Sequence, residues 1–407
     1  MTLKASLLAA VALCLAAGPL GAQTAPARTL KIGVMNDQSG PYADLGGPGS
    51  VVAARLAVED SGLAAKGWKV EVLAADHQNK ADIAANITRQ WIDNEGVDAI
   101  ADLVNSAAAL AVSHLTREKN RVLLASGPAT SDLTGKACSP NTVHWTSDTW
   151  AVAHGTAKAT VKSGGDTWFF LTTDYAFGLA LERDTSSVVT ANGGKVLGAV
   201  RAPIGASDFA SFLLQAQNSK AKIVALANSG ADTTNAIKQA AEFGLVAGGQ
   251  KIAAMLLYIS DIHALGLPVA QGIVLTSPFY WDTNDGTRAF AERFSKQMRG
   301  AKPTMIHAGT YSAVAHYLKT VAAGADSKDG AKVVTAMKAA PTDDPLFGKG
   351  TIRPDGRKIH PMFLFEVKSP AESKGPWDYY KYRATVPADE AFRPMSEGGC
   401  PLVAAVK

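Results

Sequence analysis

Short apolar runs of strand length alternate along the first third of the chain with amphipathic segments of helix length. We expect strands at 30–35, 69–74, 99–104 and 121–125, and helices at 46–61, 83–94 and 107–119. Such alternation builds a parallel sheet with helices on both faces, joined by right-handed crossovers.

The same pattern restarts after a turn-rich break at 127–140. It predicts strands at 167–171, 195–200, 222–227, 252–256 and 272–276, with helices at 149–162, 178–192, 209–218 and 231–243. Two further helices, at 285–299 and 310–323, and a strand at 362–367 follow. The fold class is therefore α/β, with two Rossmann-like lobes whose parallel sheets are joined by a hinge.

We place the first crossing between lobes at 143–147 and the return at 277–282. Lobe 1 then comprises 28–143 and 278–358, lobe 2 comprises 144–277 and 359–380, and 381–407 forms a C-terminal tail.

The N-terminus has the features of a secretory signal peptide at residues 1–22. Lys4 precedes an apolar run at 7–17, and small residues lead to a cleavage site after Ala22. The run is shorter than the ~20 residues that span a bilayer. A lipoprotein signal at Cys14 is less favoured, because Leu13 stands where a small residue is needed. We expect a periplasmic protein, and the roughly 385 remaining residues exceed a single hydrophobic core.

Two cysteines remain after cleavage, Cys138 and Cys400. Outside the cytoplasm two cysteines more often pair than stay free, so we predict a disulfide between them. Both lie in turn-rich segments that we expect to be exposed. The alternative is two unpaired or buried thiols.

The charge pattern excludes several classes of partner. The chain has 40 basic and 36 acidic residues, a formal net charge of +4, and no block of lysine or arginine. A nucleic-acid-binding stripe and a polybasic membrane patch are therefore not expected. The pattern favours a small-molecule ligand.

Polar loops follow several predicted strands at their carboxyl ends, where parallel sheets bind ligands. They lie at 105–106, 126–130, 172–175, 228–232 and 258–261. The Ser106 hydroxyl and the amides after it are suited to a carboxylate, because a helix N-terminus favours an anion. Taken singly, Ser106, Asn228 and Asp232 read as ordinary helix caps, but five such loops on one edge favour a cleft.

Four segments, three of which include or overlap these loops, together resemble the leucine/isoleucine/valine-binding family of periplasmic substrate-binding proteins of ABC transporters. They are 37–46 (DQSGPYADLG), Asn105-Ser106, 126–134 (SGPATSDLT) and 174–178 (DYAFG). The resemblance implies lobes that close over a ligand and dock on a permease. It also implies that Ser106 and Thr130, or Ala129 by its backbone, hold the ligand carboxylate and that Tyr175 lines the cleft.

The chain departs from that family's amino-acid-binding pattern. The ligand ammonium would be seated near 258–261, where Asp261 lacks the usual glutamate–glycine context. Leu45, with Tyr42 nearby, stands where an aromatic residue is usual, and Phe279 adds an aromatic ring at the return crossing. These departures resemble the branch that binds aromatic carboxylates. Hinge packing is an equal alternative for Phe279.

The predicted ligand-binding residues come from both lobes. They are Tyr42, Leu45, Asn105, Ser106, Ser126, Ala129, Thr130, Tyr175, Asn228, Asp232, Tyr258, Asp261 and Phe279. Alternative functions are binding of a branched-chain amino acid or amide, and a ligand-sensing receptor lobe pair.

Enzyme motifs are missing from the sequence. It contains no G-x-S-x-G, H-E-x-x-H, C-x-x-C or P-loop pattern, and its eight histidines lack metal-ligand spacing. We expect no enzyme activity, no cofactor and no metal, and a monomer as the working form.

Overall fold

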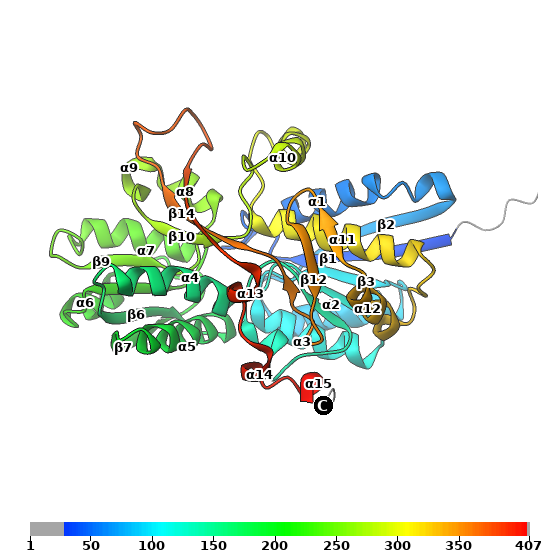
Figure 1. The fold of residues 1–407 in the computed structure, drawn as a ribbon, viewed down its shortest axis with the longest axis horizontal. Coiled ribbons are helices and arrows are strands. Elements are labelled where there is room, and N and C mark those ends of the chain that lie inside the picture. The colour runs from blue at the N-terminus through cyan, green and yellow to red at the C-terminus, as the bar shows by residue number, and fades with distance from the viewer. Residues whose placement is uncertain (1–27, 405–407) are drawn as a thin grey trace, which may run out of the picture.

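A computed structural model describes residues 28–404 as two lobes side by side (Figure 1). The predicted signal peptide, residues 1–22, lies outside the described residues. The described part contains no helix that is long and apolar enough to cross a membrane.

Lobe 1 is built on five parallel strands in the order β2-β1-β3-β4-β5. The strands are β1 (Arg28–Asn36), β2 (Trp68–Asp76), β3 (Ala99–Asp102), β4 (Val122–Ala125) and β5 (Thr142–His144). Alternate strand residues face opposite sides, so Ile100 packs toward one helix layer and Ala101 toward the other. The sequence pattern missed β5, which is only three residues long.

Helices cover both faces of this sheet. One layer contains α1 (Gly47–Asp60), α11 (Met305–Ala322) and α12 (Gly330–Ala339), and the other contains α2 (Ala81–Asp93) and α3 (Ser106–Glu118). Helix α11 begins five residues before the predicted start at 310. Its N-cap is Thr304, whose hydroxyl oxygen accepts from the amides of Ile306 and His307.

Lobe 2 has four parallel strands in the order β7-β6-β8-β9. They are β6 (Thr167–Thr173), β7 (Lys195–Ala202), β8 (Ile223–Ala227) and β9 (Lys251–Ala254). The layers on its two faces are α4 (Thr149–Lys162) with α5 (Ala176–Ala191), and α6 (Ala210–Asn218) with α7 (Ala231–Glu242). The predicted α/β class with two parallel sheets is confirmed.

A third sheet, β10-β14-β15, is antiparallel and packs beside lobe 2 (Figure 1). Its strands are β10 (Val274–Ser277), β14 (Met362–Val367) and β15 (Tyr380–Val386). Strand β15 begins at the last residue that we assigned to lobe 2 and continues to Val386, within the segment 381–407 that we assigned to the tail. Its side chains are mostly exposed, so the apolar pattern did not reveal it.

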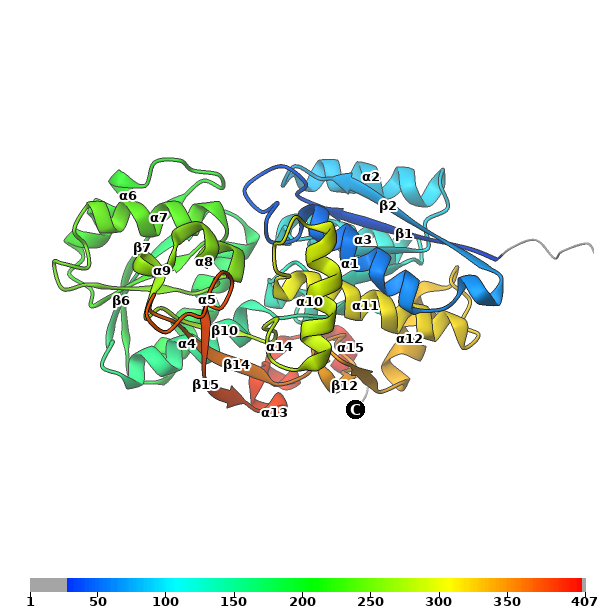
Figure 2. The ribbon, with the colours of Figure 1, turned by 90° about the horizontal axis from the view of Figure 1, so that it is seen from above.

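The remaining elements are short or lie near the crossings. They are η1 (Ala64–Lys66), η2 (Ser131–Thr134), α8 (Ile259–Leu265), α9 (Leu267–Ala270), α10 (Asp285–Gln297), β11 (Thr342–Asp344), β12 (Gly348–Ile352), β13 (Lys358–Ile359), α13 (Ala388–Ala391), α14 (Met395–Gly398) and α15 (Pro401–Ala404). Figure 2 shows α10 in front of the junction between the lobes.

Three segments connect the lobes: 145–148, 278–284 and 360–361. Two side chains just before the third segment contact the first: Arg357 Nη1 lies 3.6 Å from Asp148 Oδ2, and Lys358 Nζ lies 5.1 Å from the centre of the Trp145 ring. Burial lowers the pKa of Lys358 to about 8. We retain the division into lobes at 143/144, 277/278 and 358/359 as a proposal.

The structure joins Cys138 to Cys400, as predicted, across 262 residues of sequence. Both cysteines are buried, so the expectation that they lie in exposed positions was wrong, although Lys136, Gly399 and Pro401 beside them are exposed. The reason is tertiary: the tail folds back on the loop around residue 135, where Arg393 donates to the Ser131 carbonyl.

Candidate ligand-binding cleft

Ten residues, five from each lobe, enclose a small cavity where the lobes meet. They are Tyr42, Leu45, Val104, Gly127, Ala129, Tyr175, Phe177, Ser229, Leu256 and Tyr258. Most belong to segments that directly follow β1, β3, β4, β6, β8 and β9, so the cavity lies at the carboxyl ends of both sheets. Its volume of about 10 Å³ holds about one water molecule.

The first loop is fixed by a buried carboxylate. Asp37 accepts hydrogen bonds from the amides of Gly40 (2.7 Å) and Tyr42 (2.8 Å), and from the Asn79 amide group. These bonds form a tight turn that presents the Tyr42 ring to the other lobe.

Two contacts join the lobes directly at the cavity. The hydroxyl groups of Tyr42 and Tyr175 lie 2.9 Å apart, and the Ala231 amide donates to the Pro41 carbonyl at 3.3 Å. Gly230 precedes that amide with a φ of 59°, and a side chain there would lie 2.6 Å from the Pro41 oxygen. Glycine is therefore required for this close approach.

The tyrosines of the cavity are neutral hydrogen-bonding groups. Burial raises the pKa of Tyr42, Tyr175 and Tyr258 above the ordinary value of 10.0. They offer aromatic faces and hydroxyls and carry no charge.

The residues predicted to hold a carboxylate lie behind the cavity wall. Ser106 is fully buried, and its oxygen accepts from the Thr130 amide at 3.2 Å. Asn105 occupies the helix N-terminus, because its side chain accepts from the Ala107 and Ala108 amides. The amides that we expected to receive a ligand are thus capped by the protein.

Two other predicted residues of this lobe also have internal partners. The Thr130 hydroxyl oxygen accepts from the Asp132 amide at 3.3 Å, and the Ser126 hydroxyl lies 2.8 Å from that of Thr310. Of this loop, Ala129 and Gly127 line the cavity.

The polar residues predicted from lobe 2 point into their own lobe. Asn228 accepts from Thr233, Asp232 accepts from the Gly205 amide, and Asp261 accepts from the Tyr258 amide. Burial raises the pKa of Asp232 to about 6 and that of Asp261 to about 7. None of the three lines the cavity.

Phe279 lies in the second crossing and packs against other aromatic rings. Its ring meets Phe290 edge-on, with centroids 6.4 Å apart. It also borders a separate small cavity together with Tyr258. The ring therefore has both a packing role and a position next to the cleft.

Sequence reasoning missed five lining residues: Val104, Gly127, Phe177, Ser229 and Leu256. Each lies within two residues of a predicted one. The sequence therefore identified the loops, but it did not identify which side chains of each loop face the cleft. Ser229 is buried, and its hydroxyl has no hydrogen-bond partner among the described residues.

A buried acid lies directly behind the cavity floor. A side chain at Gly127 would approach Asp102 Oδ1 to 2.1 Å, and this oxygen has no hydrogen-bond partner among the described residues. Asn36 donates to Oδ2 at 2.5 Å. Burial raises the pKa of Asp102 to about 6.

A second, larger cavity of about 590 Å³ also lies between the lobes. Ala43 and Asp44, next to Leu45, line it from lobe 1, and Ser260 and His263 line it from lobe 2. Within residues 28–404, no group of histidine, cysteine and acidic side chains is arranged to hold a metal ion.

Comparison with known proteins accords with this architecture. The family described as "Periplasmic binding protein" matches residues 29–376. The chain belongs to this family. Among curated relatives of this periplasmic binding protein, Leu/Ile/Val-binding protein homolog 6 of Brucella melitensis is 29% identical over 362 residues, covering 87% of this chain and 91% of the relative.

Solved structures of periplasmic binding proteins are also similar to this chain. A periplasmic binding protein of Burkholderia mallei is 50% identical, with a TM-score of 0.89 and coverage of 92% and 99% of the two chains. A branched-chain amino acid ABC transporter periplasmic ligand-binding protein of Burkholderia xenovorans is 39% identical, with a TM-score of 0.79 and the same coverage.

A solute-binding protein of R. palustris in complex with 4-hydroxybenzoate is 25% identical, with a TM-score of 0.78 and coverage of 88% and 97%. The resemblance seen in the sequence is confirmed: the protein is a periplasmic substrate-binding protein of the ABC transporter type, in the branched-chain amino acid family.

Proposed function

We propose that this periplasmic binding protein captures an aromatic carboxylate between its lobes and delivers it to the permease of an ABC transporter. In this proposal the signal peptide is cleaved after Ala22, and the mature protein acts as a monomer. It catalyses no reaction and needs no cofactor.

The composition of the cavity wall carries the proposal. Three tyrosines and Phe177 supply aromatic surface, and none of the ten lining residues is acidic. An amino acid would bury its ammonium without a partner, which costs several kcal/mol, whereas an aromatic acid needs no such partner. The likeness to a protein that binds 4-hydroxybenzoate supports the same choice.

In this proposal the carboxylate lies beside Ala129 and, once the lobes separate, reaches the Ser106 hydroxyl, which is buried behind the cavity wall in the present arrangement. The Ser106 hydroxyl oxygen already accepts from Thr130, and among the described residues its hydrogen is not donated to an acceptor. Tyr42, Tyr175 and Ser229 also line the cavity, and their hydroxyls are candidate partners for a polar group on the ring. The cavity widens when the lobes separate, because five lining residues move with each lobe.

The second candidate is a branched-chain amino acid, which the names of two relatives favour. It requires Asp232 or Asp261 to leave its present amide partner and reach the ammonium. The two candidates therefore differ in whether these acids contribute to binding.

Isothermal titration of the mature protein with benzoate, 4-hydroxybenzoate and leucine separates the candidates. We expect the aromatic acids to bind, and to bind Asp232→Asn and Asp261→Asn as they bind the parent. Asp208→Asn, which changes an exposed acid of lobe 2, is the control. Tight binding of leucine that either cleft variant abolishes would establish the second candidate instead.

A thermal-shift screen provides an independent readout. A ligand at about 100 times its dissociation constant adds about 2.7 kcal/mol to the free energy of unfolding. If no aromatic acid or amino acid shifts the transition, the cleft does not bind this class of ligand.

A further inference from the structure

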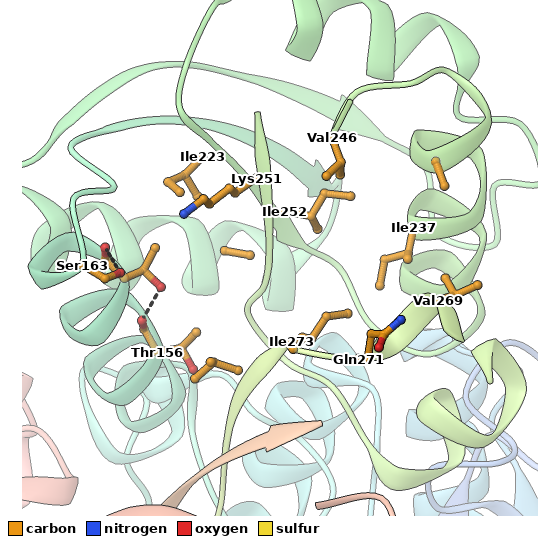
Figure 3. A pocket seen from close by; sticks show the side chains of 15 residues that line it. Thr156, Ser163, Ile223, Ile237, Val246, Lys251, Ile252, Val269, Gln271 and Ile273 are labelled. Atoms are coloured by element: carbon orange, nitrogen blue, oxygen red, sulfur yellow. Dashed lines mark hydrogen bonds between the residues drawn. The ribbon is translucent and has the colours of Figure 1, made fainter. Parts of the chain in front are cut away.

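A cavity of about 420 Å³ lies entirely within lobe 2, away from the interlobe residues described above (Figure 3). Its walls come from α4, β8, α7, β9 and the start of β10. The volume falls within the 300–1,000 Å³ typical of small-molecule sites. Because every lining residue belongs to one lobe, the cavity does not depend on closure of the cleft.

The topology explains why this space exists. In lobe 1 a fifth strand, β5, pairs with β4 at the edge of the sheet. In lobe 2 the next strand along the chain, β10, pairs with β14 in the antiparallel sheet and leaves the outer edge of β9 without a strand. The cavity occupies the place where a fifth strand would lie between the α4 and α7 layers.

The edge of β9 presents backbone polar groups to this space. The Lys251 amide donates to the carbonyl of Lys222, the residue just before β8, at 2.8 Å. Since backbone groups alternate in direction along a strand, the amide and carbonyl of Ile252 point away from β8. They face the side on which the cavity lies.

Seven of the fifteen residues that line the cavity have branched aliphatic side chains. They are Ile223, Ile237, Val246, Ile252, Val269, Ile273 and Val274, and the first six are labelled in Figure 3. Val246 and Val269 are 54% and 44% exposed, so the outer wall leaves apolar surface in contact with water. Covering that surface with hydrocarbon is favourable.

Lys251 is the one cationic residue among those that line the cavity. The hydroxyls of Thr160 and Ser163 already donate to helix carbonyls, and the Gln271 amide group donates to the Pro268 carbonyl. Lys251 has no ion-pair or hydrogen-bond partner for its ammonium group within residues 28–404. In Figure 3 its nitrogen lies on the Ser163 side of the cavity.

From this arrangement we propose a second binding site in lobe 2 for an aliphatic monocarboxylate, such as a medium-chain fatty acid. The hydrocarbon chain packs on the isoleucine and valine wall. The carboxylate pairs with the Lys251 ammonium at the edge of β9, where the Ile252 amide is a further donor. A neutral alcohol of the same length has the same apolar contacts but lacks the ion pair.

Titration of the mature protein with decanoate and with 1-decanol tests the site. Lys251→Gln should weaken decanoate binding about tenfold, the scale of one charge-assisted hydrogen bond, and leave decanol binding unchanged. Lys238→Gln is the matched control, because Lys238 is exposed on α7 and does not line the cavity.

Two filling variants locate the probe. Ala241→Phe should reduce binding of both probes, because Ala241 lines the lobe 2 cavity, whereas Ala129→Phe in the interlobe cleft should leave both unchanged. The proposal is overturned if decanoate does not saturate the parent, if Ala129→Phe alone abolishes binding, or if Lys251→Gln weakens both probes equally. Because the cleft ligand is tested separately with aromatic acids, the failure of one site is distinguishable from the failure of the other.

Discussion

The hydroxyl groups of Tyr42 and Tyr175 lie 2.9 Å apart and form a hydrogen bond between the lobes. Both side chains line the interlobe cavity, whose volume is about 10 Å³. A ring the size of benzoate therefore requires these two tyrosines to move apart. The pair connects ligand entry to the relative position of the lobes.

The first prediction concerns the energy of this pair. Tyr42→Phe and Tyr175→Phe should each lower the free energy of unfolding of the ligand-free protein by about 0.5–1.5 kcal/mol, because each leaves one hydroxyl without its partner. The double variant should lose less than the sum, and urea unfolding measures all three. Tyr382→Phe changes an exposed tyrosine and serves as the control. Strict additivity would show that the two hydroxyls do not interact.

The second prediction concerns the proposed carboxylate site. Ser106→Ala should weaken binding of 4-hydroxybenzoate by roughly 1–3 kcal/mol, the scale of a hydrogen bond to a charged group. Ser113→Ala is a matched control, since Ser113 is a buried serine of the same helix whose hydroxyl pairs with Thr142, away from the cleft. Equal loss in both variants would indicate a general effect on α3.

The third prediction concerns the pH dependence of stability. Burial raises the pKa of Asp102 from 3.8 to about 6 in the folded protein. Between these values the folded carboxyl holds a proton that the unfolded chain has lost, so its contribution to stability decreases as the pH rises from about 4 to 6.

Asp102→Asn removes this titration. The stability of the parent relative to the variant should fall by about 3 kcal/mol across that window, at 1.4 kcal/mol per pKa unit, and then stay level. Urea unfolding at intervals from pH 3.5 to 7.5 measures the difference. Because Asp232, Asp261 and His77 titrate in both proteins, the comparison isolates Asp102. A constant difference would mean that the Asp102 pKa is unshifted.

The fourth prediction concerns the disulfide. Replacing Cys138 and Cys400 by serine should lower the free energy of unfolding by about 2–4 kcal/mol, because the bond restricts a long stretch of the unfolded chain. Thiol labelling of the unfolded, unreduced parent should detect no free cysteine. Two labelled thiols per mature chain would contradict the bond.

The sequence predicted long elements better than short ones. The strands of both parallel sheets except β5 and the helices α1 to α7 stand out because an apolar period persists over several residues. Strands β5 and β13 have three and two residues, too few for a period. Their pairing depends on neighbours distant in sequence, since Arg357, next to β13, bridges to His144 of β5.

For the site, the sequence predicted which loops lie at the cleft, and the structure showed which of their side chains face it. Five of the residues named from the sequence line the cavity: Tyr42, Leu45, Ala129, Tyr175 and Tyr258. Asn105, Ser126, Asn228 and Asp261 have hydrogen-bonding partners within the protein instead. A polar residue at a helix start suits both roles, and the sequence does not reveal which partner is nearest.

By itself, the sequence determined the α/β class, the two lobes, the pairing of Cys138 with Cys400 and the family. These depend on local periodicity, cysteine count and ordered motifs. Only the tertiary structure decided that Tyr42 meets Tyr175, that no acid lines the small cavity beside this pair, and that β10 leaves the edge of β9 open. Each of these results from packing between segments far apart in sequence, where small differences in side-chain direction select one of several partners that the chain could supply.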